Sequence, residues 1–432
     1  MRVVVQGMWH LGCVIAACLA RAGHHVVGLD PDRSVIEDLR QGRAPLFEPG
    51  LEEMIGTELQ AGRLSFMSDP TAAIAGAEVL WVAFDTPVDK EDQADVAFVR
   101  SELEAVLGLL FPGTLVLISS QVPVGFTGSL ESAWASQDIQ FAYSPENLRL
   151  GTALESFQNP ERVVIGFRYE EDRPRLAALF PSTCPRLEWM SVESAEMTKH
   201  ALNAFLATSV TFINELARLC EAVGANAKEV EKGLRSDKRI GPKAYLSPGD
   251  AVSGGTLARD VCFLRQYGRH HRLGTPLLDG VLQSNELHKD WVLGHVQHLL
   301  KKGDAGVVAI LGLTYKAGTS TLRRSAAMEL CEKLHGSGVR LQVHDPKIAV
   351  LPEEFRHLGA PCNSASEALS NADVAVIATP WPEYRQLRAD TILKQMRQPQ
   401  IIDANHFLAD QLGSDPRIKY VATGRPAVGR SA

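Results

Sequence analysis

The stretch RVVVQGMWHLGCVIAACLARAGHHVVGLD (residues 2–30) sets the fold class of this chain. It opens with a β-branched run that ends at Gly7 and continues as a small, apolar helical stretch that stops near Gly23. A second strand-like run follows and ends in Asp30. Strand, helix and strand in this order predict a parallel βαβ unit. The turn after the first strand is where a dinucleotide's pyrophosphate usually meets a helix N-terminus.

That turn, GMWHLG (residues 7–12), departs from the dinucleotide fingerprint GxGxxG at its middle glycine, where Trp9 stands. The middle glycine normally lets the backbone approach phosphate closely. Asp30, at the end of the second strand, can accept both ribose hydroxyls, which favours NAD over NADP. Arg33 could touch a 2′-phosphate, although such an arginine is more often a solvated helix residue. We therefore predict that NAD is bound by Gly7, Trp9, Leu11, Gly12 and Asp30; the alternative is a Rossmann-like fold that serves only for packing.

Strand-like runs recur in two parts of the chain. In the first part they cover residues 77–84, 113–119, 139–144 and 162–167, with helical stretches between several of them. This alternation predicts a doubly wound parallel sheet over about 1–185. The second part begins at Val307 and contains four further strand-like runs, VVAILGL, VRLQVHDP, DVAVIATP and PQIIDANHF, which predict a second sheet of the same kind.

Residues 191–224, between these two parts, form one unbroken helical pattern that contains no proline and a single glycine at its end. At about 1.5 Å per residue, such a helix would exceed ~40 Å. A helix of this length often forms a spine between domains, and its exposed side can support a dimer. The predicted fold class is α/β, with two Rossmann-like doubly wound parallel-sheet domains joined by an α-helical central domain. The predicted domain bounds are 1–190, 191–302 and 303–432.

Composition excludes several other classes of protein. The 432 residues are 45% hydrophobic and 22% charged, which is ordinary for a globular chain of about three domains. The net charge is −7, and without a long basic run we do not expect a nucleic-acid partner. No apolar run is long enough to span a membrane, and the N-terminus lacks a signal-peptide pattern, so we expect a cytoplasmic protein. The seven cysteines include no CxxC pair, and we expect reduced thiols and no metal site.

The whole chain resembles the UDP-glucose/GDP-mannose dehydrogenase family. The resemblance rests on a series of motifs that occur in order along the chain: AACLARAGHHVVGLDPD, APLFEPGLEEMI, DTPVD, VPVGFT, SPENLRLGTALESFQNPERVVIG, SAEMTKHALNAFLATSVTFINE, RIGPK, ILGLTYKAGTSTLRRSAA and ATPWPEY. It implies an N-terminal NAD domain, a central helix that makes a homodimer, and a C-terminal domain that helps to hold a nucleotide sugar. Enzymes of this family oxidise a sugar alcohol to a carboxylate in two successive NAD-dependent steps.

The second of those steps uses a cysteine that this chain lacks. In the family, a thiolate from a GFGGSCFPKD-like motif captures the aldehyde as a thiohemiacetal. The corresponding stretch here is SGGTLARD (residues 253–260), and counting back from Asp260 places Thr256 where the cysteine would be. A threonine hydroxyl has a far higher pKa than a thiol and is a poor nucleophile without a dedicated base. Cys262 would point elsewhere on a helix, so core packing is its favoured role over that of a relocated nucleophile.

Two further departures affect the same step. The family's STVPVG motif, whose threonine positions a water, is SQVPVG (residues 120–125) here, so that Gln121 replaces the threonine. The second glutamate of PEFLREG, associated with general-base work on the thioester, is Leu150 here, and Glu146 is retained. Leucine cannot exchange a proton, so that base is absent.

The groups required for a first hydride transfer are retained. Lys199 and Asn203 are four residues apart on the predicted long helix and therefore share one face. In the family these two residues and Asp260 surround the reacting carbon, where the lysine can accept a proton and the asparagine can hold an oxyanion. The alternative for Lys199 is a surface ion pair with Glu196 or Glu193. The same spacing resembles the β-hydroxyacid and 6-phosphogluconate dehydrogenases, which perform one alcohol oxidation without a cysteine.

The resemblance also implies further contacts with the nucleotide sugar and with NAD. Basic groups suit a diphosphate, although each of them could be an ordinary solvated loop residue. The family's DGRN motif is DANH (residues 403–406) here, without its arginine. The residues expected to bind substrate are Glu146, Leu148, Lys199, Asn203, Arg239, Lys243, Gly255 and Lys316, and Thr86 and Arg323 are added to the NAD contacts.

These observations predict an NAD-dependent oxidoreductase that acts on an alcohol of a nucleotide sugar. We expect a single two-electron oxidation to an aldehyde or ketone. The alternatives are a four-electron dehydrogenase that forms a uronate, and a catalytically silent paralogue that binds nucleotide sugar.

Overall fold

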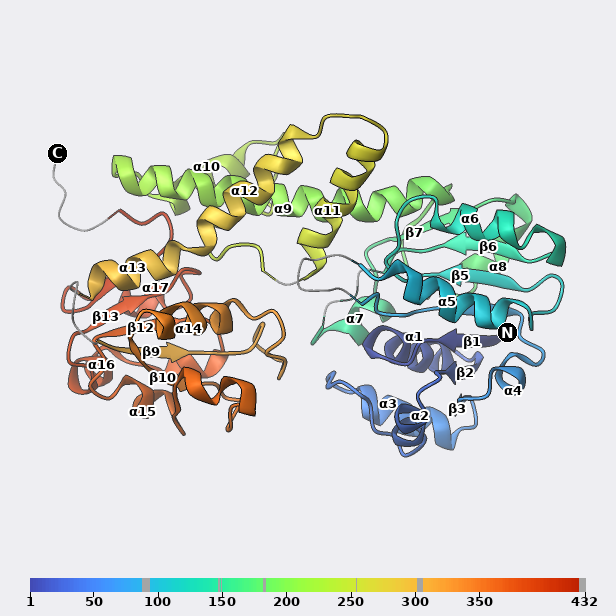
Figure 1. Cartoon of the computed structure of the whole chain (residues 1–432), viewed down its shortest axis with the longest axis horizontal. Coiled ribbons are helices and arrows are strands. Elements are labelled where there is room, and N and C mark those ends of the chain that lie inside the picture. The colour runs from blue at the N-terminus through green and yellow to red at the C-terminus, as the bar shows by residue number, and fades with distance from the viewer. Residues whose placement is uncertain are drawn as a thin grey trace. The chain divides into compact units, whose positions relative to one another are not determined.

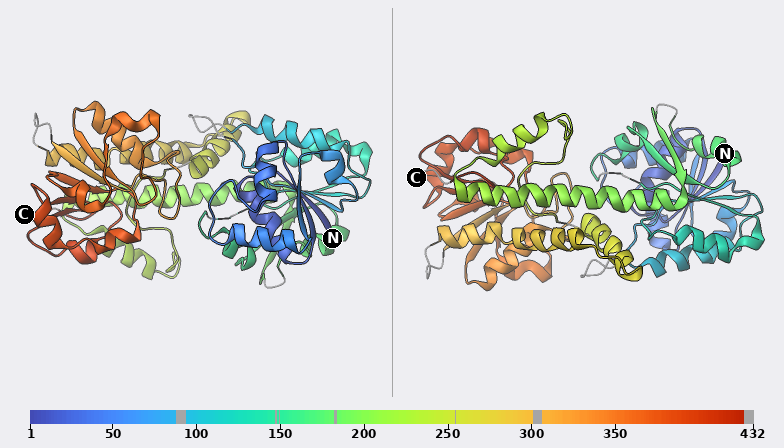
Figure 2. Two further views of the ribbon diagram at one scale, coloured as in Figure 1. Left: turned by 90° about the horizontal axis from the view of Figure 1, so that it is seen from below. Right: turned by 90° about the horizontal axis from the view of Figure 1, so that it is seen from above.

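The computed structural model describes residues 1–87, 94–146, 148, 150–181, 184–253, 255–300 and 306–426. It divides the chain into two compact units, Met1–Ala201 and Leu202–Ala432. The boundary falls within helix α9 (Val192–Val223), the long helix that Figure 2 shows in green. Each unit contains one sheet with helices on both faces (Figure 1). The prediction of two Rossmann-like sheets, a helical middle and one long helix is therefore confirmed.

The sheet of the first unit has eight strands in the order β3-β2-β1-β4-β5-β6-β7-β8. The order reverses direction between β1 and its neighbour β4, and such a switch point is where ligands bind in doubly wound sheets. Several of its strands are short, almost wholly apolar segments that are buried on both faces. The bounds are β1 Arg2–Gln6, β2 His25–Leu29, β3 Leu64–Met67, β4 Val79–Val82, β5 Leu115–Ile118, β6 Gln140–Tyr143, β7 Val163–Phe167 and β8 Leu187–Ser191.

This sheet is not wholly parallel, which corrects the prediction for its last part. Strand β7 runs antiparallel to β6, with Tyr143 opposite Gly166, and β8 then pairs parallel to β7. The run at 162–167 was expected from its apolar residues, and those residues carry no information about strand direction. Strands β3 and β8 had no counterpart among the sequence predictions. The expected helix at 191–224 starts one residue later, because Ser191 ends β8.

Two apolar layers cover the faces of the first sheet. Helix α1 is buried over most of its length, because alanine, cysteine and glycine let it lie close to the strands. One layer contains helices α1 (His10–Arg21), α3 (Leu51–Gln60), α7 (Ala153–Gln158) and α8 (Arg173–Ala177). The other contains α4 (Pro70–Ile74), α5 (Val96–Leu107), α6 (Phe126–Ala133) and the first turn of α9. Helix α2 (Arg33–Arg40) also belongs to the first layer, through its buried residues Ile36 and Leu39.

The second unit repeats the arrangement with six strands in the order β11-β10-β9-β12-β13-β14, all parallel. Their bounds are β9 Val307–Leu311, β10 Arg340–His344, β11 Ala360–Pro361, β12 Val374–Ile377, β13 Gln400–Ile402 and β14 Lys419–Val421. One apolar layer contains α13 (Trp291–Leu299) and α14 (Ala326–Gly336). The opposite layer contains α15 (Ala365–Leu369), α16 (Ala389–Gln395) and α17 (Ala409–Leu412).

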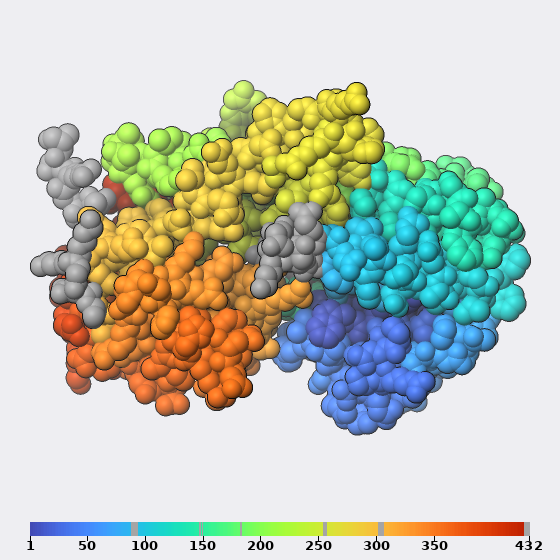
Figure 3. Space-filling view, viewed as in Figure 1, coloured from blue at the N-terminus to red at the C-terminus, as the bar shows by residue number. Residues whose placement is uncertain are grey.

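The helical middle completes the second unit. After α9 come α10 (Ala227–Ser236), α11 (Gly255–His270) and α12 (Pro276–Lys289). Helices α11 and α12, yellow in Figure 3, lie at the surface of this unit. They pack on α9 through a small apolar cluster that includes Ala204, Ala207 and Val261. No helix in the described part of the chain is long and apolar enough to cross a membrane.

Candidate active site

The turn after β1 is shaped by two glycines. Gly7 has a backbone φ of +96°, a conformation that favours glycine, and its amide donates to the Leu29 carbonyl at 2.9 Å. A Cβ on Gly12 would lie only 1.8 Å from the Gly7 carbonyl oxygen. Helix α1 can therefore begin directly beside the end of β1 only if residue 12 has no side chain. This close packing is the role of the third glycine in a dinucleotide fold.

Asp30 follows β2 and faces the same turn. Its Oδ2 accepts a hydrogen bond from the Met8 amide at 2.7 Å, and its Oδ1 accepts one from the Asp32 amide at 2.9 Å. Each carboxylate oxygen has two lone pairs, so this half-buried side chain keeps acceptor capacity for ribose hydroxyls. The glycine frame and this aspartate fit the adenosine side of NAD.

Trp9 takes its place in the turn without backbone strain. It has φ −99° and ψ −155°, which any L-residue adopts, and its side chain is 47% exposed. The next residues begin α1, and the Leu11 amide faces Oδ2 of Asp85 at 3.5 Å. Arg33 is exposed at the first position of α2. Asp85 is a contact that the sequence analysis missed, although its neighbour Thr86 was expected among the NAD contacts.

Glu48 is a second residue that sequence reasoning missed. Its buried carboxylate accepts hydrogen bonds from the amides of Gly151 at 2.7 Å and Ala153 at 2.8 Å, and its Oε2 lies 2.8 Å from His10 Nε2. It thereby ties the start of α1 to the segment before α7. In the sequence, Glu48 is only one acidic residue within the motif APLFEPGLEEMI, and this pattern does not indicate that its side chain is buried.

The loop after β5 is joined to its surroundings by two side chains. Thr86, predicted to contact NAD, is buried and donates its hydroxyl to the Gln121 carbonyl at 2.7 Å. His200 of α9 lies with its Nε2 2.9 Å from the Val122 carbonyl. The structure thus brings the predicted residues Thr86, which follows β4, and Gln121, which follows β5, together.

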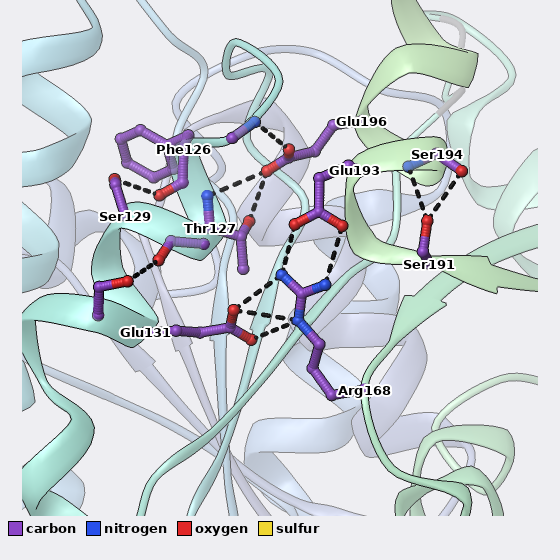
Figure 4. A network of polar contacts seen from close by, with 12 residues as sticks. Phe126, Thr127, Ser129, Glu131, Arg168, Ser191, Glu193, Ser194 and Glu196 are labelled. Atoms are coloured by element: carbon purple, nitrogen blue, oxygen red, sulfur yellow. Dashed lines mark hydrogen bonds and ion pairs between the residues drawn. The ribbon is translucent and has the colours of Figure 1, made fainter.

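Glu196, a fully buried carboxylate on the first part of α9, binds the start of helix α6 (Figure 4). It accepts hydrogen bonds from the Gly125 amide at 2.6 Å, the Thr127 amide at 3.0 Å and the Thr127 hydroxyl at 2.7 Å. Burial raises the pKa of Glu196, and these three donors oppose the increase. Glu196 occupies the N-terminus of α6, where an anion is electrostatically favoured.

A second connection in Figure 4 involves Arg168, which follows β7. Its guanidinium binds Glu131 of α6 at 2.8 Å and Glu193 of α9 at 2.6 Å. The hydrogen bonds from Arg168 lower the pKa of Glu193. Glu193 and Glu196, which sequence analysis offered as alternative partners for Lys199, are thus engaged with Arg168 and with the start of α6.

Lys199 lies one turn beyond Glu196 on α9. Its Nζ donates to the backbone carbonyl of Glu146 at 2.6 Å, so two predicted site residues meet. Of the same motif, Asn147 and Arg149 lie outside the described residues. Leu148 and Leu150 are half-buried, and Leu148 packs against the apolar layer that contains α1. The predicted substrate contact of Leu148 stays a prediction beside this packing contact.

The second unit holds the other retained pair. Asn203 of α9 donates its side-chain amide to the carboxylate of Asp260 on α11, and both side chains are buried. Gly255 and Thr256 form the first turn of α11, and Gly254 lies outside the described residues. Cys262 is two residues after Asp260, about 200° around the helix, so it faces away from the Asn203 contact. This agrees with the expectation that Cys262 points elsewhere.

The basic residues expected at the diphosphate lie in loops of the second unit. Arg239 is exposed and binds Asp237 at 2.7 Å, and Lys243 is also exposed. Lys316 accepts a hydrogen bond on its carbonyl from the buried Thr319 hydroxyl at 3.0 Å. Arg323 is exposed, and its amide donates to Thr321 at 3.3 Å.

Asn405, which stands where the family motif has arginine, is used inside the fold. Its side-chain oxygen accepts a hydrogen bond from the Asp250 amide at 3.0 Å, and its amide group donates to the Asp250 carboxylate. Burial raises the pKa of Asp250 to about 6. Asn405 therefore joins the loop that follows β13 to the segment that precedes α11.

Comparison with known proteins assigns this architecture. Three models of the UDP-glucose/GDP-mannose dehydrogenase family match in order: the NAD binding domain over residues 1–183, the central domain over 193–287 and the UDP binding domain over 309–410. UDP-glucose 6-dehydrogenase of Rhizobium meliloti is 32% identical over 442 residues, which cover 99% of this chain and 100% of that protein. UDP-glucose 6-dehydrogenase TuaD of Bacillus subtilis is 31% identical over 99% of this chain and 94% of its own length.

A solved structure agrees with these relatives. The UDP-glucose dehydrogenase of the hyperthermophilic archaeon Pyrobaculum islandicum has a TM-score of 0.88 and 29% identity, covering 99% of this chain and 98% of its own. NAD is thus the cofactor, as the turn and Asp30 predicted. The chain belongs to the UDP-glucose/GDP-mannose dehydrogenase family and is an NAD-dependent nucleotide-sugar dehydrogenase.

Proposed function

We propose that this enzyme performs one two-electron oxidation, from a nucleotide-sugar alcohol to an aldehyde or ketone. The observation that carries the proposal is Thr256 in the position of the family's nucleophilic cysteine. An aldehyde has no hydride to release until a nucleophile or water adds to its carbonyl. With Leu150 and Gln121 in place of a base and a water-positioning hydroxyl, three substitutions affect that same addition.

The cysteines that the chain does possess support this proposal. Cys13 and Cys18 lie within the buried face of α1, and burial is the main cause that raises the pKa of both thiols, to about 12 for Cys18. A protonated, enclosed thiol is a poor nucleophile. Cys262 is half-buried on α11 and directed away from Asp260. None of these three sulfurs is a ready replacement for a thiolate at position 256.

The proposed proton acceptor is Lys199. Its Nζ donates a hydrogen bond to the Glu146 carbonyl at 2.6 Å, which helps to position the ammonium group. Lys199 accepts the alcohol proton once it is neutral, either directly or through a water. NAD, when bound, supplies the acceptor for the hydride.

Asn203 is the proposed oxyanion donor. The Asp260 carboxylate holds one N–H of the Asn203 amide group, which orients the second N–H of the same group. A pre-oriented donor stabilises negative charge on the substrate oxygen without further reorganisation. Lys199 and Asn203 are four residues apart in the sequence and lie one turn apart on the same face of α9.

A panel of nucleotide sugars tests the proposal, with NADH counted per substrate consumed and the product mass measured. We expect one NADH and a carbonyl product that hydroxylamine traps. Two NADH and a carboxylate would overturn the single oxidation in favour of a four-electron dehydrogenase. Tight sugar-nucleotide binding without any NADH would favour a silent paralogue.

Variants at two positions complete this test. Thr256→Val removes the hydroxyl at nearly constant volume, and we expect unchanged stoichiometry and rate if Thr256 has no nucleophilic role. Lys199→Ala should lower turnover by about 10²–10⁴-fold, the range for a general base. Asn203→Ala should also lower turnover, whereas an unchanged rate in both variants would contradict the assigned roles.

We propose in addition that the enzyme is a homodimer formed through α9. Phe205, Phe212 and Leu219 recur every seven residues along this helix and are 69%, 51% and 58% exposed. Such a stripe along one side of a helix is typical of a protein interface. Light scattering at micromolar concentration should give a dimer, and Phe212→Glu should give a monomer. The domain bounds 1–190, 191–302 and 303–432 belong to the same proposal.

A further inference from the structure

Glu48 lies where the starts of three helices of the first unit meet. Its carboxylate contacts His10, the first residue of α1, and accepts from the amide of Ala153, the first residue of α7. Its backbone carbonyl accepts from the amide of Leu51, the first residue of α3, at 3.1 Å. The side chain is 1% exposed. Because helix dipoles favour negative charge at helix N-termini, this is a favourable position for a buried carboxylate.

One oxygen atom of Glu48 joins α1 to the segment before α7. Oε2 lies 2.8 Å from His10 Nε2 and also accepts from the Gly151 amide at 2.7 Å, while Oε1 accepts from the Ala153 amide at 2.8 Å. A carboxylate that faces two backbone N–H groups is an acceptor, so Nε2 of His10 carries the hydrogen of the third bond. Since His10 and Gly151 share one oxygen, a shift of either residue changes the bond to the other.

Each side of this contact leads to a functional group. His10 directly follows the turn at residues 7–9, and in an NAD domain the dinucleotide's diphosphate is held at the start of this helix. A ligand bound there restricts the first turn of α1. On the other side, Glu146 precedes Gly151 by five residues in the sequence, and its carbonyl accepts from Lys199 Nζ at 2.6 Å.

The elements around Glu48 are firmly packed. Helices α1, α3 and α7 belong to one apolar layer, and close-packed layers of this kind transmit displacements instead of absorbing them. Pro45 and Pro49 stand in the segment that carries Glu48, where their rings restrict the backbone. A change at the start of α1 therefore reaches the segment before α7 through Glu48.

We propose that His10 and Glu48 are positioning residues that couple the NAD turn to the segment of Glu146 and Gly151. Bound dinucleotide holds His10 in place, His10 holds the Glu48 carboxylate, and the segment that contacts Lys199 is ordered as a result. The role of Lys199 as general base belongs to the proposed function. The coupling itself depends neither on that role nor on the number of hydrides transferred.

Hydrogen exchange of the Gly151 and Ala153 amides tests this coupling in the full chain, with NADH as the ligand and mass spectrometry with electron-transfer fragmentation as the readout. In the unaltered protein we expect saturating NADH to slow exchange of both amides by about 10-fold, within the usual range for coupled sites. His10→Phe keeps a ring but removes its nitrogens, and NADH should then slow both amides by less than about 2-fold. His10→Gln should retain the effect, because its side-chain NH₂ can donate to Glu48.

The matched control is His25→Phe. His25 is exposed at the start of β2, at the edge of the sheet opposite the NAD turn, and its substitution should leave the NADH effect unchanged. NADH binding is measured by calorimetry and folding by circular dichroism in every variant, and His10→Ala replaces His10→Phe if the latter does not fold.

Three results would overturn the proposal. The first is an unaltered protein in which NADH leaves exchange of the Gly151 and Ala153 amides unchanged. The second is an equal NADH effect in the unaltered protein and in His10→Phe. The third is loss of the effect in His10→Gln as well as in His10→Phe, because the hydrogen bond to Glu48 would then not be the link. Failure of the proposed function would instead appear in the NADH count and the product mass, and would leave the exchange result unchanged.

Discussion

The two sheets begin with the same local geometry. Gly7 after β1 and Gly312 after β9 both have φ +96°. The Gly7 amide donates to the Leu29 carbonyl at 2.9 Å, and the Gly312 amide donates to the His344 carbonyl at 2.7 Å. A side chain at either glycine would collide with the segment that follows the neighbouring strand. The turn after the first strand is therefore a property of the doubly wound sheet and not of NAD binding.

Both units also have an aspartate after the second strand of their βαβ unit, but the two aspartates differ in the hydrogen bonds that they accept. Asp30 and Asp345 each accept from the amide that follows the glycine, at 2.7 Å from Met8 and 2.7 Å from Leu313. Asp345 is 4% exposed, and its Oδ2 also accepts from the Trp381 indole at 3.0 Å. Asp30 is half-buried and has spare acceptors. The available lone pairs, and not the aspartate itself, therefore distinguish a dinucleotide site from a structural one.

The largest effect is expected at the glycine that only the first turn requires. In the first unit α1 starts at His10, directly after the turn, whereas α14 starts at Ala326 after a long loop. Gly12→Ala would place a Cβ against the Gly7 carbonyl, and we expect a loss of about 4 kcal/mol of stability, at the upper end for a single substitution. Urea unfolding measures this loss.

Gly56→Ala is the matched control for this change. Gly56 lies in α3 of the same unit, and a Cβ there would meet no atom within 4 Å. This substitution should be neutral or stabilising, because alanine is favoured over glycine by about 1 kcal/mol in a helix. A stable Gly12→Ala protein would mean that α1 can move away from the turn, and the contrast between the two turns would disappear.

The next largest effect separates the two aspartates. The Asp345 carboxylate accepts hydrogen bonds from several buried donors, including the amides of Leu313 and Thr314. In Asp345→Asn, the NH₂ group of the new side chain is itself a donor and cannot accept these bonds. We expect a loss of about 3 kcal/mol, the upper range for leaving buried donors unsatisfied. Asp30→Asn should cost less than about 1 kcal/mol, because water can replace its partners at this half-buried site. Equal losses in urea unfolding would contradict the assigned difference.

Much of this fold could be predicted because its strands are short, buried and rich in valine, isoleucine and leucine. Strand β3 was missed, because its sequence LSFM contains no β-branched residue and alternates in burial, unlike the valine-rich and isoleucine-rich strands. The reversal of β7 was missed, because apolar pattern is the same in both strand directions. Helix α9 was predicted within one residue, since no proline interrupts it.

The candidate site was predictable where a residue type is tied to a turn, as at Gly7 and Asp30. It was not predictable where a carboxylate binds distant backbone amides. Glu48 meets Gly151 and Glu196 meets Gly125, and in both pairs the donor is a backbone group that has no sequence signature. Such contacts depend on how loops far apart in the chain are brought together, which local patterns do not encode.

A third, smaller effect concerns the ligand that the first aspartate serves. Asp30→Asn should weaken NAD binding by about 10-fold, because an amide oxygen accepts ribose hydroxyls less strongly than a carboxylate. The same variant should weaken NADP binding less, since it removes a charge that repels the 2′-phosphate. Calorimetry with both dinucleotides measures the ratio, and an unchanged NAD-to-NADP ratio would show that Asp30 is structural, like Asp345.

The smallest effect is expected just after these two aspartates, where the structures of the two segments differ. Asp32 and Lys347 each donate an amide to the preceding aspartate, at 2.9 and 2.8 Å, but only Asp32 also caps a helix. The hydroxyl and amide of Ser34, together with the Val35 amide, lower the pKa of Asp32. A folded pKa below the unfolded value gives stability that is present above about pH 4 and is lost as the pH falls through the folded pKa.

Asp32→Asn keeps a capping oxygen and should flatten this acid dependence of the urea midpoint, whereas Asp32→Ala should lower the midpoint at neutral pH as well. Parallel pH profiles for all three proteins would mean that the cap contributes nothing, and that α2 depends on packing alone.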